Sequence, residues 1–159
     1  MDADLLRLDR QVCFALAAAS RSVIGLYRPV LEPLGLTHPQ YLVMLSLWEK
    51  SPRRVREIAD QLLLDSATLS PLLKRLEAAR LIERRRDPAD ERALNVTLTP
   101  AGAALRERAE AVPAQVVELL GIPVDQLEET RDLLTRLIAA SARAQGGAAA
   151  PAAVEDVPA

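Results

Sequence analysis

The sequence predicts a mainly helical protein with a small β-hairpin, arranged as a winged helix-turn-helix. Alanine and leucine dominate its 159 residues and only four are aromatic, which favours helices over an all-β fold. Apolar residues recur at helical spacing through most of the chain, and one alternating stretch at residues 94–99 follows a charged segment. Half of the residues are hydrophobic, so a chain of this length can bury the core of one domain.

The first predicted element is a long helix over residues 5–31. Apolar residues step by three or four positions from Leu8 to Val30, and a second apolar stripe runs beside them. Two adjacent stripes exceed what one core contact requires, so we expect this helix to pack on a second chain as well. Pro29 and Pro33 are expected to close the helix.

Three shorter elements are predicted next. Thr37 and Gln40, three residues apart, form a capping box, which predicts a helix from there through Trp48. Residues 53–55 are expected to form a short strand. Residues 56–62 place their apolar side chains on one face and are expected to form a short helix.

The following helix contains a proline. Asp65 and Ser66 give a capping signal, and leucines at helical spacing continue from there to Ala79. A helix that begins at this signal includes Pro71, whereas Ser70 as N-cap with Pro71 in the first position would cost less locally. We expect the earlier start, with the proline tolerated.

Two strands and a polar connection predict the hairpin. Residues 81–86 and 94–99 are the expected strands, and the polar segment 87–93 predicts a long loop between them. Three apolar residues of the second strand are expected to face inward: Leu94, Val96 and Leu98.

Two helices are predicted after the hairpin. Thr99 as N-cap and Pro100 in the first position begin a helix that should run to about Leu120. The last helix is expected over residues 125–143. Residues 144–159 are of low complexity and are expected to be a disordered tail.

The charge is unevenly distributed. The net charge is −2, but residues 50–92 carry 11 Lys/Arg and eight Asp/Glu, a local charge of +3, and the remaining residues sum to −5. A basic middle in an acidic protein is typical of a surface that binds a polyanion, and a solvated charged surface is the alternative. In a winged helix-turn-helix, the helix at residues 66–79 enters the major groove and the hairpin reaches the minor groove.

Several function classes lack the residues that they need. With one cysteine, Cys13, and one histidine, His38, we expect no disulfide framework, no metal site and no cofactor. No glycine-rich phosphate loop is present, so we expect no enzyme; a thiol peroxidase using Cys13 is the one enzyme alternative, and it lacks a resolving cysteine. The absence of an 18-residue apolar stretch and the acidic N-terminus predict a soluble, cytoplasmic protein without a membrane partner.

Three segments carry a family resemblance: residues 62–82, Asp90-Glu91-Arg92, and Leu98-Thr99 followed by Gly102. Together they resemble the MarR family of dimeric winged-helix transcription regulators. A glycine usual at the exit of the recognition helix is replaced by Ala79 or Arg80, which we take as a minor departure. The resemblance implies a single domain over residues 1–143, with dimerisation helices at 5–36 and 100–143 and a DNA-binding part at 37–99.

The resemblance also implies a pseudo-palindromic double-stranded DNA partner for a homodimer. Arg92 in the wing is expected to enter the minor groove, with Asp90 orienting it. Arg84 and Arg86 are expected to contact phosphate. The residues expected to face the major groove or its phosphates are Ser66, Thr68, Ser70, Lys74 and Arg75.

The N-terminal half resembles a narrower branch, the organic-hydroperoxide-sensing repressors of the one-cysteine type. The resemblance lies in residues 11–16, 27–29 and 36–42. It implies that Cys13 is the peroxide-reactive thiol and that Tyr27 donates a hydrogen bond to it across the dimer. Two further tyrosine positions of the branch hold Ala17 and His38 in this chain. His38 is expected beside the partner's thiol.

Helix geometry independently favours an arrangement across the dimer. Cys13 and Tyr27 are 14 residues apart, which corresponds to roughly 21 Å along a helix, on nearly the same face. Without a second cysteine, the sulfenic acid would be trapped by a low-molecular-weight thiol or a backbone nitrogen. The alternative is a MarR-type repressor released by a small aromatic or lipophilic ligand, with Cys13 structural.

Overall fold

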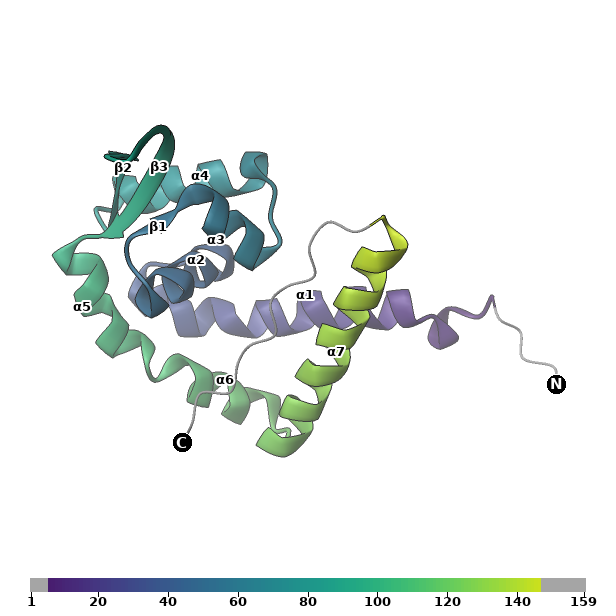
Figure 1. The fold of residues 1–159 in the computed structure, drawn as a ribbon. Coiled ribbons are helices and arrows are strands. Elements are labelled where there is room, and N and C mark those ends of the chain that lie inside the picture. The colour runs from purple at the N-terminus through teal and green to yellow at the C-terminus, as the bar shows by residue number, and fades with distance from the viewer. Residues whose placement is uncertain (1–5, 147–159) are drawn as a thin grey trace.

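The computed structural model describes residues 6–146, in which a winged helix-turn-helix is flanked by two outlying helices (Figure 1). This confirms the predicted fold class. Residues 1–5 and 147–159, which include most of the expected tail, lie outside the described residues. The elements in chain order are η1 (Leu8–Arg10), α1 (Val12–Leu31), η2 (Glu32–Leu34), α2 (His38–Glu49), β1 (Arg53–Arg54), α3 (Val55–Leu62), α4 (Ser66–Ala78), β2 (Ile82–Asp87), β3 (Asp90–Leu98), α5 (Pro100–Ala109), α6 (Val112–Leu120) and α7 (Val124–Ala144).

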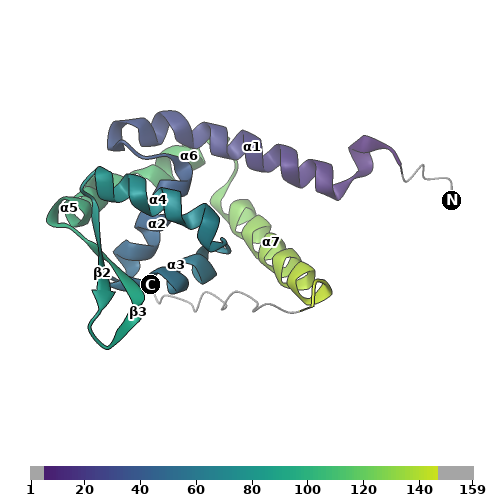
Figure 2. The same cartoon turned by 90° about the horizontal axis from the view of Figure 1, so that it is seen from above.

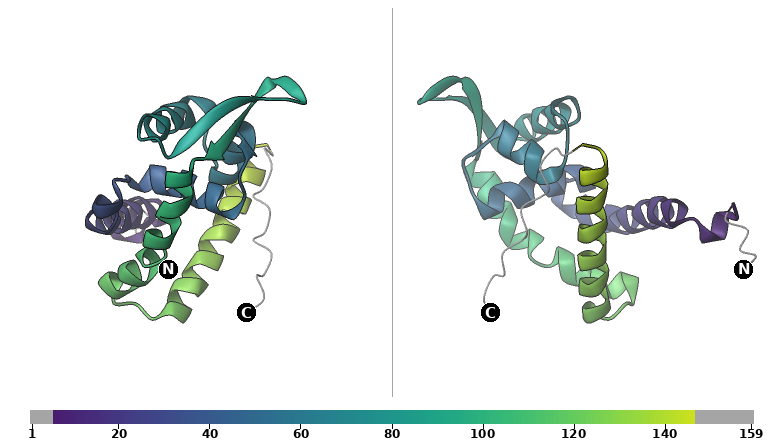
Figure 3. Two further views of the ribbon diagram at one scale, coloured as in Figure 1. Left: turned by 90° about the vertical axis from the view of Figure 1, so that its left-hand side faces the viewer. Right: turned by 45° about the vertical axis from the view of Figure 1, so that its right-hand side comes forward.

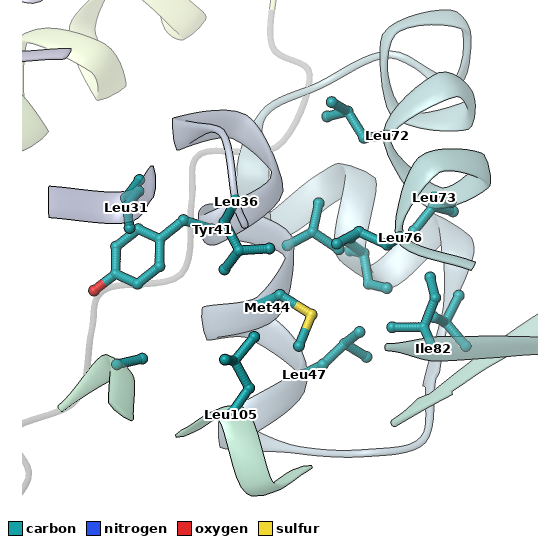
Figure 4. Close-up of a cluster of buried hydrophobic side chains, with 14 of the residues drawn as sticks. Leu31, Leu36, Tyr41, Met44, Leu47, Leu72, Leu73, Leu76, Ile82 and Leu105 are labelled. Carbon is teal, nitrogen blue, oxygen red and sulfur yellow. The ribbon is translucent and has the colours of Figure 1, made fainter. Parts of the chain in front are cut away.

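The core forms around α2, which packs on α3, α4 and α5 (Figure 4). Met44 and Leu47 of α2 are almost fully buried, as are Leu73 and Leu76 of α4 and Ile82 of β2. Burying side chains of this size is the main favourable contribution to folding. The core therefore fixes α4 and the base of the hairpin against one central helix.

Local capping signals place the central helices as predicted. Thr37 donates its N–H to Gln40 Oε1 at 2.9 Å and accepts the N–H of Gln40, which completes the capping box at the start of α2. Asp65 accepts the N–H of Thr68 at 2.6 Å, so α4 begins at Ser66 and contains Pro71, as expected.

The predicted long loop of the hairpin is wrong. The sheet has the order β1-β3-β2, both pairs are antiparallel, and β2 and β3 are joined by Pro88 and Ala89 alone. The hairpin projects from the helical body beside α4 (Figure 3). Val96 is fully buried at its base, whereas Leu94 is 43% exposed, so the inward placement of Leu94 is also wrong. No second layer covers the projecting part, which is why Leu94 stays partly exposed and most of its neighbours there are charged.

Two predicted helix boundaries need correction. The first helix begins at Val12, because the backbone at Gln11 is extended and separates η1 from α1. Its end at Leu31 is as predicted, with Pro29 inside the helix and Pro33 just beyond it. The single helix predicted from Pro100 to Leu120 is two helices, α5 and α6, because the ring of Pro113 would clash with the carbonyl four residues earlier in a continuous helix.

The exit of α4 has a backbone conformation that favours glycine, although Arg80 occupies the position. Arg80 takes a left-handed conformation with φ of +59°, which costs an ordinary residue roughly 1 kcal/mol or more relative to glycine. Its carbonyl accepts a hydrogen bond from Thr99 Oγ1 at 2.7 Å, and the N–H of Leu81 closes the helix end on the carbonyl of Leu76. These bonds hold Arg80 in a conformation that glycine would adopt freely.

Candidate nucleic-acid interface and thiol site

The α4 helix presents one polar, exposed face. Leu69, Leu72, Leu73 and Leu76 point into the core. Within residues 6–146, neither Lys74 nor Arg75 forms an ion pair. The five residues predicted to face the major groove are all exposed: Ser66, Thr68, Ser70, Lys74 and Arg75. This face carries hydroxyl donors and acceptors at its start and positive charge in its later turns, which suits contacts to base edges and phosphates.

The wing places Arg92 in a strand, three residues after the turn. Asp90 accepts the backbone N–H of Arg92 at 3.1 Å, so the expected influence of Asp90 on Arg92 acts on its backbone. Arg92 is exposed, and Arg86 donates to the carbonyl of Glu91 at 3.2 Å. The projecting hairpin and α4 lie side by side, as the views of Figure 1 and Figure 3 agree.

Arg84 has a partner that sequence patterns did not reveal. Glu77, near the end of α4, accepts bonds from Nε and Nη2 of Arg84 at 3.0 and 2.6 Å and one from its backbone N–H at 3.2 Å. These bonds lower the pKa of the Glu77 carboxyl. Arg84 thus ties β2 to α4, and Glu77 holds the guanidinium that was expected to contact phosphate. No local spacing signals this pair, because a helix exit separates the two residues.

Cys13 lies in the first turn of α1 and is exposed. The predicted helix begins at residue 5 and places Cys13 inside it, whereas α1 begins at Val12 and places Cys13 at its start. Backbone N–H groups of a first helical turn have no intrahelical acceptor and favour negatively charged groups nearby. The adjacent Val12 and Phe14 are 65% and 43% exposed, so the thiol lies within an uncovered apolar surface.

Tyr27 and His38 meet at the other end of α1. Their ring centroids are 4.8 Å apart in an edge-on arrangement, and Tyr41 lies 6.0 Å from Tyr27. Burial lowers the pKa of His38 and raises the pKa of Tyr27, so both side chains are favoured in their neutral, hydrogen-bonding forms. The structure brings Tyr27 and His38 together. Cys13 lies about 21 Å from Tyr27 along α1.

A chain of aromatic rings links this pair to α5. Tyr41 lies 6.3 Å from Trp48, and the indole Nε1 of Trp48 donates to the carbonyl of Gly102 at 2.9 Å. Beside these rings, a groove of about 300 Å³ opens between α2 and the α5–α6 segment. Its lining residues are Tyr41, Leu45, Trp48, Glu49, Arg106, Ala109, Glu110 and Pro113.

The outlying helices carry a large uncovered apolar surface. The N-terminal half of α1 extends away from the winged part, and α7 stands apart from it (Figure 2). α7 has no buried residue along its 21 residues, although it is amphipathic. The exposed large apolar residues on these helices and on the segments next to them are Leu6, Leu8, Val12, Phe14, Ile24, Leu119, Ile122, Val124, Leu133, Leu134, Leu137 and Ile138.

Acidic, histidine and cysteine side chains do not cluster in the described part of the chain: no three of them lie close enough there to hold a metal ion. None of the helices between residues 6 and 146 combines the length and apolar character that crossing a membrane requires.

Comparison with known proteins places these features among regulators. The profile of the MarR family matches residues 36–94. The organic hydroperoxide resistance transcriptional regulator of Bacillus subtilis (strain 168) is 40% identical over 135 residues, which cover 85% of this chain and 92% of that protein. A structure of reduced AbfR bound to DNA is 35% identical, with a TM-score of 0.66, and the match covers 82% of this chain and 96% of AbfR, a protein of Staphylococcus epidermidis. CouR from Rhodococcus jostii RHA1 bound to p-coumaroyl-CoA is 27% identical, with a TM-score of 0.71, over 83% of this chain and 94% of CouR.

Proposed function

The chain belongs to the MarR family of transcriptional regulators, and from that premise we propose that it is a homodimeric repressor that senses organic hydroperoxides through Cys13. The observation that carries this proposal is the exposed position of Cys13 in the first turn of α1, between the exposed apolar residues Val12 and Phe14. Likeness to a hydroperoxide resistance regulator of Bacillus subtilis supports it. In this proposal the protein acts by binding DNA. In the thiol peroxidase alternative it would instead reduce hydroperoxides catalytically.

The proposed chemistry begins at the Cys13 sulfur. Its thiolate attacks one peroxide oxygen, the O–O bond breaks, and the alkoxide leaves and takes a proton to become an alcohol. Cys13 then carries a sulfenic acid. A low-molecular-weight thiol condenses with it, releasing water and leaving a mixed disulfide. The larger, polar group disturbs the apolar surface that sets the spacing of the two α4 helices.

Tyr27 and His38 of one subunit are proposed to face Cys13 of the other. An antiparallel pair of α1 helices would bring the two ends of α1 together, and the run from Ala17 to Ser20 would allow close approach. The Tyr27 hydroxyl then donates to the thiolate, and neutral His38 stands where the branch has a tyrosine. This arrangement agrees with the contact between Tyr27 and His38 within one chain.

Residues 5–36 and 100–143 are proposed to dimerise, and residues 37–99 to bind DNA, within one domain over residues 1–143. At micromolar concentration, light scattering should give the mass of two chains, because exposed apolar patches of this extent are covered in stable proteins. Replacing Leu133 and Leu137, which lie on α7, with lysine should shift the mass toward one chain. A monomer in the unmodified protein would contradict the proposed dimer.

Arg92 is proposed to read the minor groove of a pseudo-palindromic operator. Arg92→Ala should weaken binding to a duplex selected by the unmodified protein by about 1–3 kcal/mol, the usual range for one specific contact. Fluorescence anisotropy at physiological salt measures this. Arg106→Ala, which changes a charge on α5 away from the wing, is the control and should leave affinity nearly unchanged. Equal affinity of Arg92→Ala and the unmodified protein for the duplex would contradict a contact between the wing and the DNA.

The sensing step is tested by treating the DNA-bound protein with cumene hydroperoxide. Release of the duplex, followed by anisotropy and reversed by excess thiol, supports the proposal. The proposal is contradicted if the protein retains the duplex although mass spectrometry shows that Cys13 is oxidised.

A second candidate function is release by a small aromatic or lipophilic ligand, with Cys13 structural. The groove of about 300 Å³ beside Tyr41 and Trp48 favours it, as does likeness to CouR, which binds p-coumaroyl-CoA. Release by hydroperoxide that does not depend on Cys13 would make this candidate the better one.

A further inference from the structure

The turn of the wing is joined by one carboxylate to the strand that precedes α3. Asp87, the last residue of β2, has a side chain that is 12% exposed. Its Oδ1 accepts the N–H of Ala89 in the turn at 2.9 Å. Its Oδ2 accepts hydrogen bonds from Nε and Nη2 of Arg54 at 3.1 and 2.8 Å. The hydrogen bond from Ala89 foremost, and those from Arg54 and Asn95 after it, lower the pKa of Asp87.

Arg54 lies at the start of the helix-turn-helix, where a hydrogen bond to α3 and strand pairing at the base of the wing both hold its backbone. It forms β1, where it pairs with Asn95 of β3, and its N–H donates to Glu57 of α3 at 2.8 Å. The contact with Asp87 therefore crosses 33 residues of sequence to connect the start of α3 with the wing turn. Asp90 and Arg92 follow that turn directly.

We propose that Arg54 and Asp87 are positioning residues that fix the wing tip relative to the helix-turn-helix and so determine how well the protein distinguishes its operator from other DNA. The inference rests on the proposed function, since it requires that the wing contacts DNA. By charge alone Arg54 resembles a phosphate contact in a basic segment. Its guanidinium instead binds a carboxylate that also organises the turn.

Opposite charge changes separate positioning from electrostatics. Arg54→Met removes a positive charge, and Asp87→Asn removes a negative one. If only charge matters, the first variant weakens and the second strengthens binding to every duplex, and the ratio of affinities for operator and scrambled DNA stays constant. If the contact positions the wing, both variants lower that ratio.

The experiment measures this ratio by anisotropy, with a duplex that the unmodified protein selects from a random-sequence library and a scrambled duplex of equal length. We expect each single variant to lower the ratio about three- to tenfold, and the double variant to be no worse than either single one. Arg7→Met and Asp9→Asn alter an exposed ion pair at η1, far from the wing, and should leave the ratio unchanged. An unchanged ratio in both single variants, or additive losses in the double variant, overturns the proposal.

A second measurement does not depend on DNA. Hydrogen–deuterium exchange at the Ala89 amide should speed up in Arg54→Met and Asp87→Asn, whereas exchange in α2 should not change. If circular dichroism shows that a neutral variant is unfolded, Arg54→Lys replaces it. This variant keeps the positive charge but loses the contact through two nitrogens. Failure of the unmodified protein to select any duplex would defeat the proposed function, and unchanged exchange at Ala89 would defeat the contact itself.

Discussion

Gly102→Ala should destabilise the folded protein by about 3 kcal/mol or more, because among the described glycines only Gly102 has no room for a methyl group. Gly102 is buried in the first turn of α5, where Thr99 caps the helix by accepting its N–H at 3.0 Å. A Cβ at this position would overlap the backbone carbonyl of Leu81. Backbone cannot rotate away as a side chain does, so α5 or the base of the wing must move.

Thermal or urea unfolding, followed by circular dichroism, measures this loss. Ala101→Ser adds one atom on the exposed side of the same turn and should change stability by less than about 0.5 kcal/mol. The Trp48 bond to the Gly102 carbonyl should weaken with the displacement of α5. Equal stability of Gly102→Ala and the unmodified protein would show that the close approach between α5 and Leu81 is absent in solution.

Cys13→Ser should abolish release of DNA by organic hydroperoxide while leaving DNA affinity within about twofold of the unmodified protein. The hydroxyl is nearly the size of the thiol, but it does not react with peroxides to form a sulfenic acid. Because Cys13 is the only cysteine in the sequence, no other thiol can substitute for it. Anisotropy of the bound duplex during treatment with cumene hydroperoxide gives the result, and continued release in this variant would assign sensing elsewhere.

Tyr27→Phe is the companion variant. It keeps the ring that packs on His38 and Tyr41 and removes only the hydroxyl. Slower oxidation of Cys13 with unchanged DNA affinity would support the proposed hydrogen bond across the dimer. The rate is measured by trapping the sulfenic acid and analysing the protein by mass spectrometry.

The sequence predicts the helices of the winged part well because local signals set their ends. The capping box at Thr37 and Gln40 and the N-cap at Asp65 act within four residues, so spacing alone locates them. Pro113 marks the break between α5 and α6, but apolar residues on both sides of it keep a helical spacing that hides the break. The loop of the wing is shorter than predicted because the alternation of apolar residues stops where the hairpin leaves the core, while strand pairing continues to Asp87 and Asp90.

The candidate site is less visible in the sequence because its contacts are distant along the chain. Helical spacing predicted which face of α4 is exposed. The bonds of Glu77 to Arg84 and of Asp87 to Arg54 depend on how helix exits and strands turn in space, and no periodicity encodes them. Cys13 was identified by resemblance, but its location at a helix start depended on a single extended residue, Gln11.

The aromatic chain that ends at Trp48 gives the protein a built-in optical reporter. Trp48 is the only tryptophan, so the intrinsic indole emission comes from one point where α2 meets α5. Displacement of α5 changes the hydrogen bond of that indole and its exposure to water, and both alter its emission wavelength. Movement of α5 relative to α2 can therefore be followed in unlabelled protein, in real time and in the absence of DNA.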